Sequence, residues 1–243
     1  MKSLIIGASA GLGRSLAEVM ARAGDEIFLV SSDAEDLAAI SADLKVRFGA
    51  KVLYVASDMN GEDPVALRQK VLKTFGAPDN LLYVAGVSDH DDSGPVDDAL
   101  ALRLGVVNFL AGVRIVNAFL PGLADGPNAN IVGIGSVAAC RGRRNNSIYG
   151  AAKRGLEYYF EALRHYLVGR PCRVQFYRLG YLRTSMTFGQ KLPFPALDPN
   201  TAAEIIHANL GRDLGAAYLP WWWGGIVTLL RMLPWPLFKR LNI

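Results

Sequence analysis

The chain has 243 residues, a net charge of +4 and 51% hydrophobic residues, which suits one α/β domain with a substantial core. Its two cysteines, Cys140 and Cys172, lack the spacing of a metal site or a redox pair, so we expect free thiols. The apolar run after Lys2 is too short for a signal peptide, and no uninterrupted apolar run reaches the roughly 18 residues that span a bilayer. These properties favour a cytoplasmic protein.

The net charge hides an asymmetry between the two parts of the chain. Residues 1–100 carry 9 basic and 16 acidic side chains, a net charge of −7, whereas residues 101–243 carry 17 basic and 6 acidic side chains, a net charge of +11. A basic half suits a nucleic acid, an anionic membrane or an anionic substrate. We favour a solvated surface with a few phosphate contacts, and we expect no nucleic-acid partner.

Short apolar runs alternate with segments of helical periodicity along the chain. The predicted strands cover residues 4–6, 27–30, 52–55, 81–85, 130–135, 173–179 and 217–219. The predicted helices cover residues 12–23, 33–48, 64–75, 97–120, 149–168 and 201–211. This alternation predicts an α/β fold, a doubly wound parallel sheet of about seven strands with helices on both faces. We expect one domain over residues 1–220, followed by an apolar tail over residues 221–243.

Three glycines, Gly7, Gly11 and Gly13, lie between the first predicted strand and the first predicted helix. Glycine permits positive φ, and the missing Cβ lets a backbone approach phosphate groups closely. The helix N-terminus that follows offers N–H groups to a pyrophosphate. The spacing G-x3-G-x-G differs from the standard G-x-G-x-x-G fingerprint. The turn therefore predicts a dinucleotide site, with a tight turn that binds no ligand as the alternative.

A tyrosine and a lysine lie four residues apart in the predicted helix 149–168. Tyr149 and Lys153 therefore share one helix face. A free phenol has a pKa of about 10, and a nearby ammonium lowers it by stabilising the phenolate. Ser136, just after the strand 130–135, can donate a hydrogen bond to a substrate oxygen. Together with the glycine turn, these residues predict proton transfer coupled to hydride transfer on a carbonyl or an alcohol.

The segment Ile6-Gly7-Ala8-Ser9-Ala10-Gly11-Leu12-Gly13-Arg14 resembles the cofactor loop of the short-chain dehydrogenase/reductase family. The resemblance covers about residues 1–220, and it implies a Rossmann-type fold. Further motifs follow in the family's order: Ala85-Gly86, Asn108, Ser136, Tyr149-x3-Lys153, Gly180 and Thr184.

The resemblance also implies roles for four residues. Tyr149 would be the general acid in reduction, and Lys153 would tune it and hold the nicotinamide ribose. Ser136 would position the carbonyl, and Asn108 would hold a water in the proton relay. The chain departs from the family at Tyr83-Val84, where Asn-Asn is usual, at Gly135 before the serine, and at Leu179, where proline is usual.

The residue after the second strand selects between the two nicotinamide cofactors. An aspartate there would bind the ribose hydroxyls and repel a 2′-phosphate, but Ser31 and Ser32 hold this position. We therefore favour NADP, and NAD stays open because Asp33 follows directly, unless Asp33 caps the next helix. Arg14 could add positive charge. Asp58 resembles the family residue near the adenine amino group, with a loop cap as the alternative.

The expected cofactor-binding residues come from these motifs and strand ends. They are Gly7, Ser9, Ala10, Gly11, Leu12, Gly13, Ser31, Ser32, Asp58, Met59, Ala85, Gly86, Tyr149, Lys153, Gly180 and Thr184.

Two loops bear on the substrate and on metals. Residues 186–200 contain phenylalanines and prolines, which favours an apolar or acyl substrate; a surface loop pinned by prolines is the alternative. The acidic segment 88–92 is interpreted as a solvated loop, and we expect no metal.

The tail contains Trp221-Trp222-Trp223 and carries Arg231, Lys239 and Arg240 as its charged residues. Prolines and Arg231 argue against a spanning helix. Tryptophans with flanking cations suit a segment that lies in a membrane interface. Burial against a second subunit, or over the pocket, is the equal alternative.

We therefore expect an NADP-dependent oxidoreductase that acts on a small carbonyl or alcohol substrate, as a homodimer or homotetramer. Two other function classes stay open. One is a non-catalytic NADP-binding redox sensor, and the other is a scaffold that binds a membrane or a partner through the tail.

Overall fold

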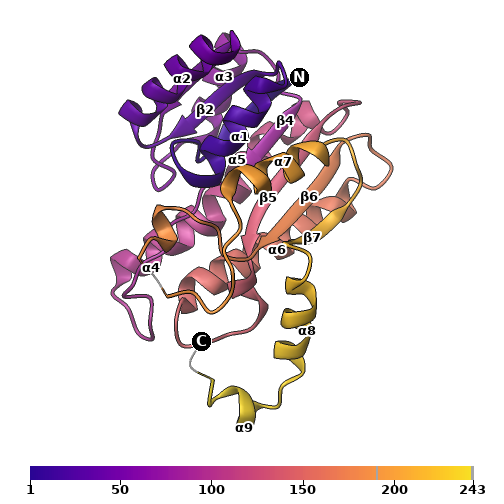
Figure 1. The fold of residues 1–243 in the computed structure, drawn as a ribbon. Helices are drawn as coiled ribbons and strands as arrows, with labels where there is room; N and C mark the ends of the chain where they lie inside the picture. Colours follow the sequence, from indigo (N-terminus) through magenta and orange to yellow (C-terminus); the bar gives the residue numbers. More distant parts are fainter. Residues whose placement is uncertain (190, 242–243) are drawn as a thin grey trace.

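The computed structural model describes residues 1–189 and 191–241 (Figure 1). Within these residues, seven parallel strands form one sheet in the order β3-β2-β1-β4-β5-β6-β7. The strand order runs outward from β1 in both directions, which confirms the predicted doubly wound sheet. The strands are β1 (Lys2–Ile6), β2 (Glu26–Ser31), β3 (Val52–Ala56), β4 (Asn80–Tyr83), β5 (Asn130–Ser136), β6 (Arg173–Leu179) and β7 (Gly215–Leu219).

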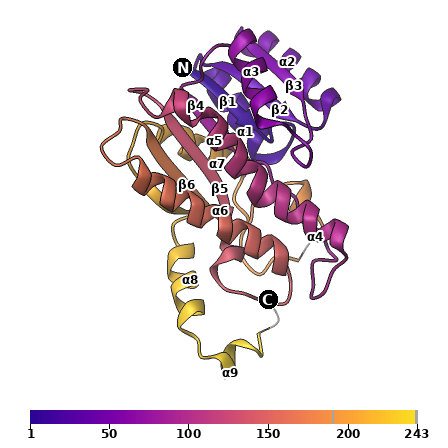
Figure 2. The same ribbon diagram turned by 180° about the vertical axis from the view of Figure 1, so that it is seen from behind.

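Helices cover both faces of the sheet (Figures 1 and 2). One face carries α1 (Gly11–Arg22), α2 (Ala34–Phe48) and α7 (Pro199–Ala208), and the other carries α3 (Pro64–Thr74), α5 (Ala111–Leu123) and α6 (Ser147–Tyr166). Side chains alternate between the faces along each strand. In β1, Leu4 and Ile6 join the core on the α3-α5-α6 side, whereas Ile5 joins the core on the opposite side. Both apolar layers are thereby filled.

The predicted strand 81–85 ends earlier, at Tyr83. The amides of Val84 and Ala85 both donate to the carbonyl of Ile6, at 2.9 Å each, so the backbone turns out of the sheet there. Tyr83 replaces a family asparagine, and its buried hydroxyl donates to the carbonyl of Val107 at 2.6 Å. A tyrosine therefore supplies a hydrogen bond from β4 to the helical segment that follows it.

The predicted helix 97–120 is divided by an irregular turn. It consists of α4 (Asp98–Gly105), a π-helical turn over Val106–Leu110, and α5. The side-chain amide of Asn108, inside this turn, donates to the carbonyl of Leu104 at 3.0 Å. A side chain that competes for a helix carbonyl perturbs the regular ladder, and π turns often mark functional sites.

The stretch Asp98–Leu123 is long and apolar enough to cross a membrane by length and composition alone. Arg103 and Arg114 interrupt it, so the sequence shows no continuous apolar run. In the fold, Ile115 and Phe119 lie in the core against the sheet. We interpret the stretch as a core helix of the folded domain.

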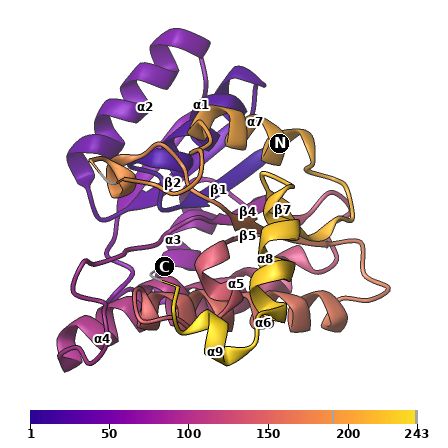
Figure 3. The same ribbon diagram turned by 60° about the horizontal axis from the view of Figure 1, so that its bottom comes forward.

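The tail forms α8 (Trp223–Met232) and α9 (Trp235–Phe238), which extend away from β7 (Figure 3). Residue 190 of the predicted loop 186–200, and the last two residues of the predicted tail 221–243, lie outside the described residues.

Candidate active site

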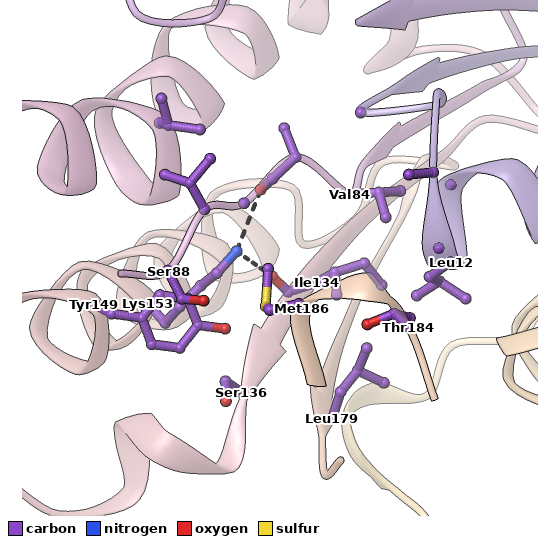
Figure 4. A pocket seen from close by; sticks show the side chains of 18 of the residues that line it. Leu12, Val84, Ser88, Ile134, Ser136, Tyr149, Lys153, Leu179, Thr184 and Met186 are labelled. Atoms are coloured by element: carbon purple, nitrogen blue, oxygen red, sulfur yellow. Dashed lines mark hydrogen bonds between the residues drawn. The ribbon is translucent and has the colours of Figure 1, made fainter. Parts of the chain in front are cut away.

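A cleft of about 690 Å³ lies at the carboxyl ends of the strands, where ligands bind in sheets of this topology. Every cofactor-binding residue that the sequence predicts lines this cleft, and so do Ser136, Tyr149 and Lys153. Asn108 does not line it. Figure 4 shows Ser136, Tyr149 and Lys153 on one side of the cleft, with Leu12 and Thr184 on the other.

The glycine loop needs glycine at two positions for steric reasons. Gly7 has a φ of +92°, and a Cβ on it would lie 2.5 Å from the amide nitrogen of Ala85. A Cβ on Gly13 would lie 1.9 Å from the carbonyl oxygen of Gly7. No described side chain caps α1 at Ala10, so the N–H groups of its first turn are available to an anion in the cleft.

The end of β2 brings two hydroxyl groups to the cleft. The Oγ atoms of Ser9 and Ser31 are 2.7 Å apart, and Ser32 lines the cleft beside them. Asp33 does not line the cleft, and its carboxylate accepts the amide of Asp36 as the N-cap of α2. The sequence left open whether Asp33 binds the ribose of the cofactor or caps the next helix. The structure shows that it caps the helix.

The end of β3 contributes Ser57 and Asp58. Asp58 lines the cleft and also accepts the amide of Asn60 at 2.9 Å, so its capping alternative is observed too. Ser57 lines the cleft, and its buried hydroxyl has no hydrogen-bond partner among the described residues. Arg14, which the sequence offered as a source of positive charge, is not among the described residues that line the cleft.

Lys153 is buried in the centre of the site, with 3% of its surface exposed. Its Nζ donates to the carbonyls of Ile134, at 3.2 Å, and Ala85, at 3.3 Å (Figure 4). A Cβ on Gly86 would lie 3.0 Å from this Nζ, so the glycine leaves room for the ammonium. Burial lowers the pKa of Lys153 to about 8, because desolvation disfavours the charged form.

The pKa of Tyr149 differs from the sequence expectation. The Lys153 ammonium, 5.9 Å from the Tyr149 ring centroid, was expected to lower it. Burial of the phenol instead raises this pKa, and the Ser136 hydroxyl and the Arg143 guanidinium oppose the rise. The phenol is therefore held in its protonated form at neutral pH.

The side chain of Asn108 is fully buried and committed to backbone groups. Its amide nitrogen donates to the carbonyls of Val87, at 2.7 Å, and Leu104, and its oxygen accepts the amide of Val87 at 3.1 Å. Asn108 thus ties the loop after β4 to the π turn. In this geometry it is a positioning residue beside Lys153 and Gly86.

The acidic segment 88–92 is not wholly solvated, contrary to the sequence interpretation. Asp92 is buried, with 1% exposed, and its carboxylate accepts the amides of Ile148 and Tyr149 and the hydroxyl of Ser147, at 2.8 to 2.9 Å. The N-cap residue, Asn146, makes no side-chain cap. Asp92 therefore anchors the first turn of the helix that carries Tyr149, as a capping carboxylate does.

The tail docks on the loop that follows Ser136. The Arg141 guanidinium donates to the carbonyls of Leu230 and Leu233 and stacks on the Phe238 ring, 3.8 Å from its centroid. A second arginine, Arg231 of the tail, donates from its Nε to the carbonyl of Cys140 in that loop at 3.1 Å. The tail therefore contacts the chain's own loop after β5, a contact that the sequence did not predict, and no described tail residue lines the cleft.

Aromatic side chains gather where the tail meets the end of β6. The Trp223 ring packs against Tyr181, Phe194 and Trp222, with centroids 5.0 to 5.8 Å away. A Cβ on Gly180 would lie 1.9 Å from Trp223 Nε1, so this glycine admits the indole. Tyr181 also lines the cleft, which links the aromatic cluster to the substrate side.

Sequence reasoning missed Ser57, Asp92, Arg143 and Tyr181. Arg143 carries the one usable signal, because it lies in the short segment between Ser136 and Tyr149. No sequence signal pointed to Asp92, because its contacts with α6 join residues that are more than fifty positions apart in the chain.

The variant Lys153→Met tests the burial of the ammonium. The pKa of Lys153 falls from an ordinary 10.5 to about 8 in the folded state, so between these pH values the unfolded chain holds a proton that the folded chain lacks. Wild-type stability should therefore rise with pH across this window, relative to the variant, by on the order of 3 kcal/mol. Urea unfolding of both proteins from pH 7.5 to 10.5 measures this. If the free energy of unfolding changed with pH in the same way in wild type and in the variant, the account would be contradicted.

The variant Asp92→Ala tests the anchor of α6. It removes the acceptor of three hydrogen bonds, and we expect a loss of about 1–3 kcal/mol in the free energy of unfolding. The neighbouring Asp91, which is exposed, gives the control Asp91→Ala, expected within about 0.5 kcal/mol of wild type. Denaturant unfolding compares the three proteins, and equal stability of both variants would remove Asp92 from this role.

Known proteins resemble this chain over most of its length. The family profile described as short chain dehydrogenase matches residues 2–191. An uncharacterized oxidoreductase of Myxococcus xanthus is 27% identical over 238 residues, 97% of this chain and 94% of that protein.

Two solved structures share the fold. A short-chain dehydrogenase from Sphingobium yanoikuyae, in complex with NADPH, has a TM-score of 0.82 and 24% identity, and the match covers 96% of each chain. A bulky-bulky ketone specific alcohol dehydrogenase from Comamonas testosteroni has a TM-score of 0.81 and 22% identity, over 99% of this chain and 94% of that one. The family match and the cleft lead to one conclusion: this chain belongs to the short-chain dehydrogenase family of NAD(P)-dependent oxidoreductases.

Proposed function

We propose that the protein transfers hydride between NADP(H) and a carbonyl or alcohol substrate, with Tyr149 as the proton donor in reduction. One observation carries the proposal: a single cleft joins the glycine loop at one end to Ser136, Tyr149 and Lys153 at the other. The glycine loop would hold the pyrophosphate of a dinucleotide, and the residues around Tyr149 would face its nicotinamide. When bound, the nicotinamide supplies or accepts the hydride.

The chain's own residues supply the proton chemistry. Burial raises the pKa of Tyr149, so the phenol is protonated and ready to donate to a carbonyl oxygen. The Ser136 hydroxyl, which acts on the same phenol, can donate to that oxygen and fix its position. Lys153 donates to two backbone carbonyls, which leaves its third N–H to donate to the ribose of a bound cofactor.

The proposed preference for NADP rests on the end of β2. Ser31 and Ser32 line the cleft there, and neither repels a 2′-phosphate. Asp33, the carboxylate that follows Ser32 in the chain, caps α2 and does not line the cleft. The Sphingobium relative was solved with NADPH, in line with this preference.

The proposed substrate is a ketone, or the matching alcohol, with an apolar part. Tyr181 lines the cleft and belongs to the aromatic cluster around Trp223. The Comamonas structure is described as specific for bulky ketones, which supports a ketone as the substrate class.

The variant Tyr149→Phe tests the reaction. Removing a general acid costs about 100- to 10,000-fold in turnover. We expect that loss in the reduction of test ketones, followed by absorbance of the reduced nicotinamide, with NADPH affinity unchanged within threefold. The exposed Tyr158 on the same helix gives the control Tyr158→Phe, which should keep full activity. Cofactor binding by wild type and Tyr149→Phe alike, with turnover in neither, would favour the redox sensor.

We also propose that the exposed side of the tail contacts an anionic membrane surface. Trp221 is 82% exposed and Trp235 is 64% exposed, while Trp223, Val227 and Phe238 are buried. The tail has basic but no acidic side chains. Exposed tryptophans with cations suit the interface of an anionic bilayer.

The double variant Trp221→Ser/Trp235→Ser tests this contact. We expect its partition onto phosphatidylserine-containing liposomes to fall at least tenfold in a sedimentation assay. Val46→Ser, which removes an apolar side chain that is 86% exposed on α2, is the control and should partition like wild type. Equal partition of all three proteins would rule out the tail as the contact.

A further inference from the structure

We propose that Arg143 binds an anionic group, a carboxylate or a phosphate, on the carbonyl substrate. The inference rests on the proposed function and narrows its substrate class to an amphipathic compound, with a carbonyl at Tyr149 and an anion at Arg143.

Arg143 belongs to the segment between Ser136 and Tyr149, and its charge acts on the Tyr149 phenol. It follows the 3-10 turn Val137–Cys140 after β5 and lines the cleft together with Ser136 and Tyr149. Its positive charge acts on Tyr149 strongly enough to oppose the rise in that residue's pKa. The guanidinium therefore belongs to the substrate end of the cleft.

Arg143 lacks the partners that nearby arginines have. Its Nε is buried and has no hydrogen-bond partner among the described residues, and no described carboxylate pairs with it. By contrast, Arg141 donates to two carbonyls of the tail, and Arg178 holds Glu157. A buried donor without a partner costs about 1–3 kcal/mol, which a ligand that accepts its hydrogen bond can recover.

The charges around the cleft favour an anion at this end. Among the described residues that line the cleft, Asp58 is the sole carboxylate, and it follows β3, whereas three cations, Arg103, Arg143 and Lys153, line the cleft. Two buried carboxylates on or near α6 are already engaged, Asp92 by the first turn of that helix and Glu157 by Arg178. A guanidinium offers a planar set of donors that fits a carboxylate or a phosphate with two hydrogen bonds.

The test measures the affinity of matched acids and amides by calorimetry, with and without bound NADPH. The probes are 4-acetylbenzoate against 4-acetylbenzamide, and phenylglyoxylate against phenylglyoxylamide, so that two carbonyl-to-carboxylate separations are sampled. A third probe, 4-acetylphenyl phosphate, distinguishes a phosphate from a carboxylate. We expect wild type to bind at least one anion at least tenfold more tightly than the matched neutral compound.

Three variants test whether Arg143 causes the preference for anions over neutral compounds. Arg143→Gln should abolish it, and Arg143→Lys should retain part of it. Arg144→Gln, which removes an exposed arginine at the next position, should leave it unchanged. NADPH affinity should stay within threefold of wild type in all three variants.

The outcomes separate this inference from the proposed function. Equal affinity for anions and neutral compounds, or binding of none of the probes, would overturn the role of Arg143. A loss of NADPH affinity in Arg143→Gln without any anion preference would assign the residue to the cofactor and overturn it too. An anion preference in a protein that does not bind NADPH would support the Arg143 site and contradict the proposed function.

Discussion

The buried ammonium of Lys153 is the interaction on which the site depends. A charge with so little exposure needs fixed partners, and the carbonyls of Ile134 and Ala85 supply them from β5 and from the loop after β4. Those two carbonyls are neighbours because β4 and β5 pair in parallel. The strand order of the sheet therefore determines where the lysine is stable, and with it the position of Tyr149 one helical turn earlier.

The helix that carries Tyr149 and Lys153, α6, is held on both sides of Tyr149. Asp92 fixes the first N–H groups of α6, and the Lys153 ammonium fixes the helix to the sheet one turn later. Tyr149 lies between these two anchors, so its phenol has a defined position before any ligand binds. Preorganisation of this kind lowers the cost of reaching the reactive geometry. The tail adds a third support, because Arg141 and Arg231 tie it to the loop that follows Ser136.

Much of the fold could be predicted from the sequence because the signals are local. Apolar runs such as 173–179 predict strands, and Pro64 and Gly24 mark where helices begin and end. The motifs around Gly7 and Tyr149 could be assigned because the family spacing is strict. The π turn at Asn108 and the Asp92 anchor could not, since both depend on contacts between segments that only the folded chain brings together. The direction of the Tyr149 pKa shift was also wrong, because burial cannot be read from a spacing.

Calorimetric titration with NADPH, and separately with NADH, tests the central claim most directly. The claim is that the cleft between the glycine loop and Lys153 holds a dinucleotide, and that Ser31 and Ser32 admit its 2′-phosphate. The account predicts saturable binding of NADPH at one site per chain, at least tenfold tighter than binding of NADH. Binding of neither dinucleotide would contradict it.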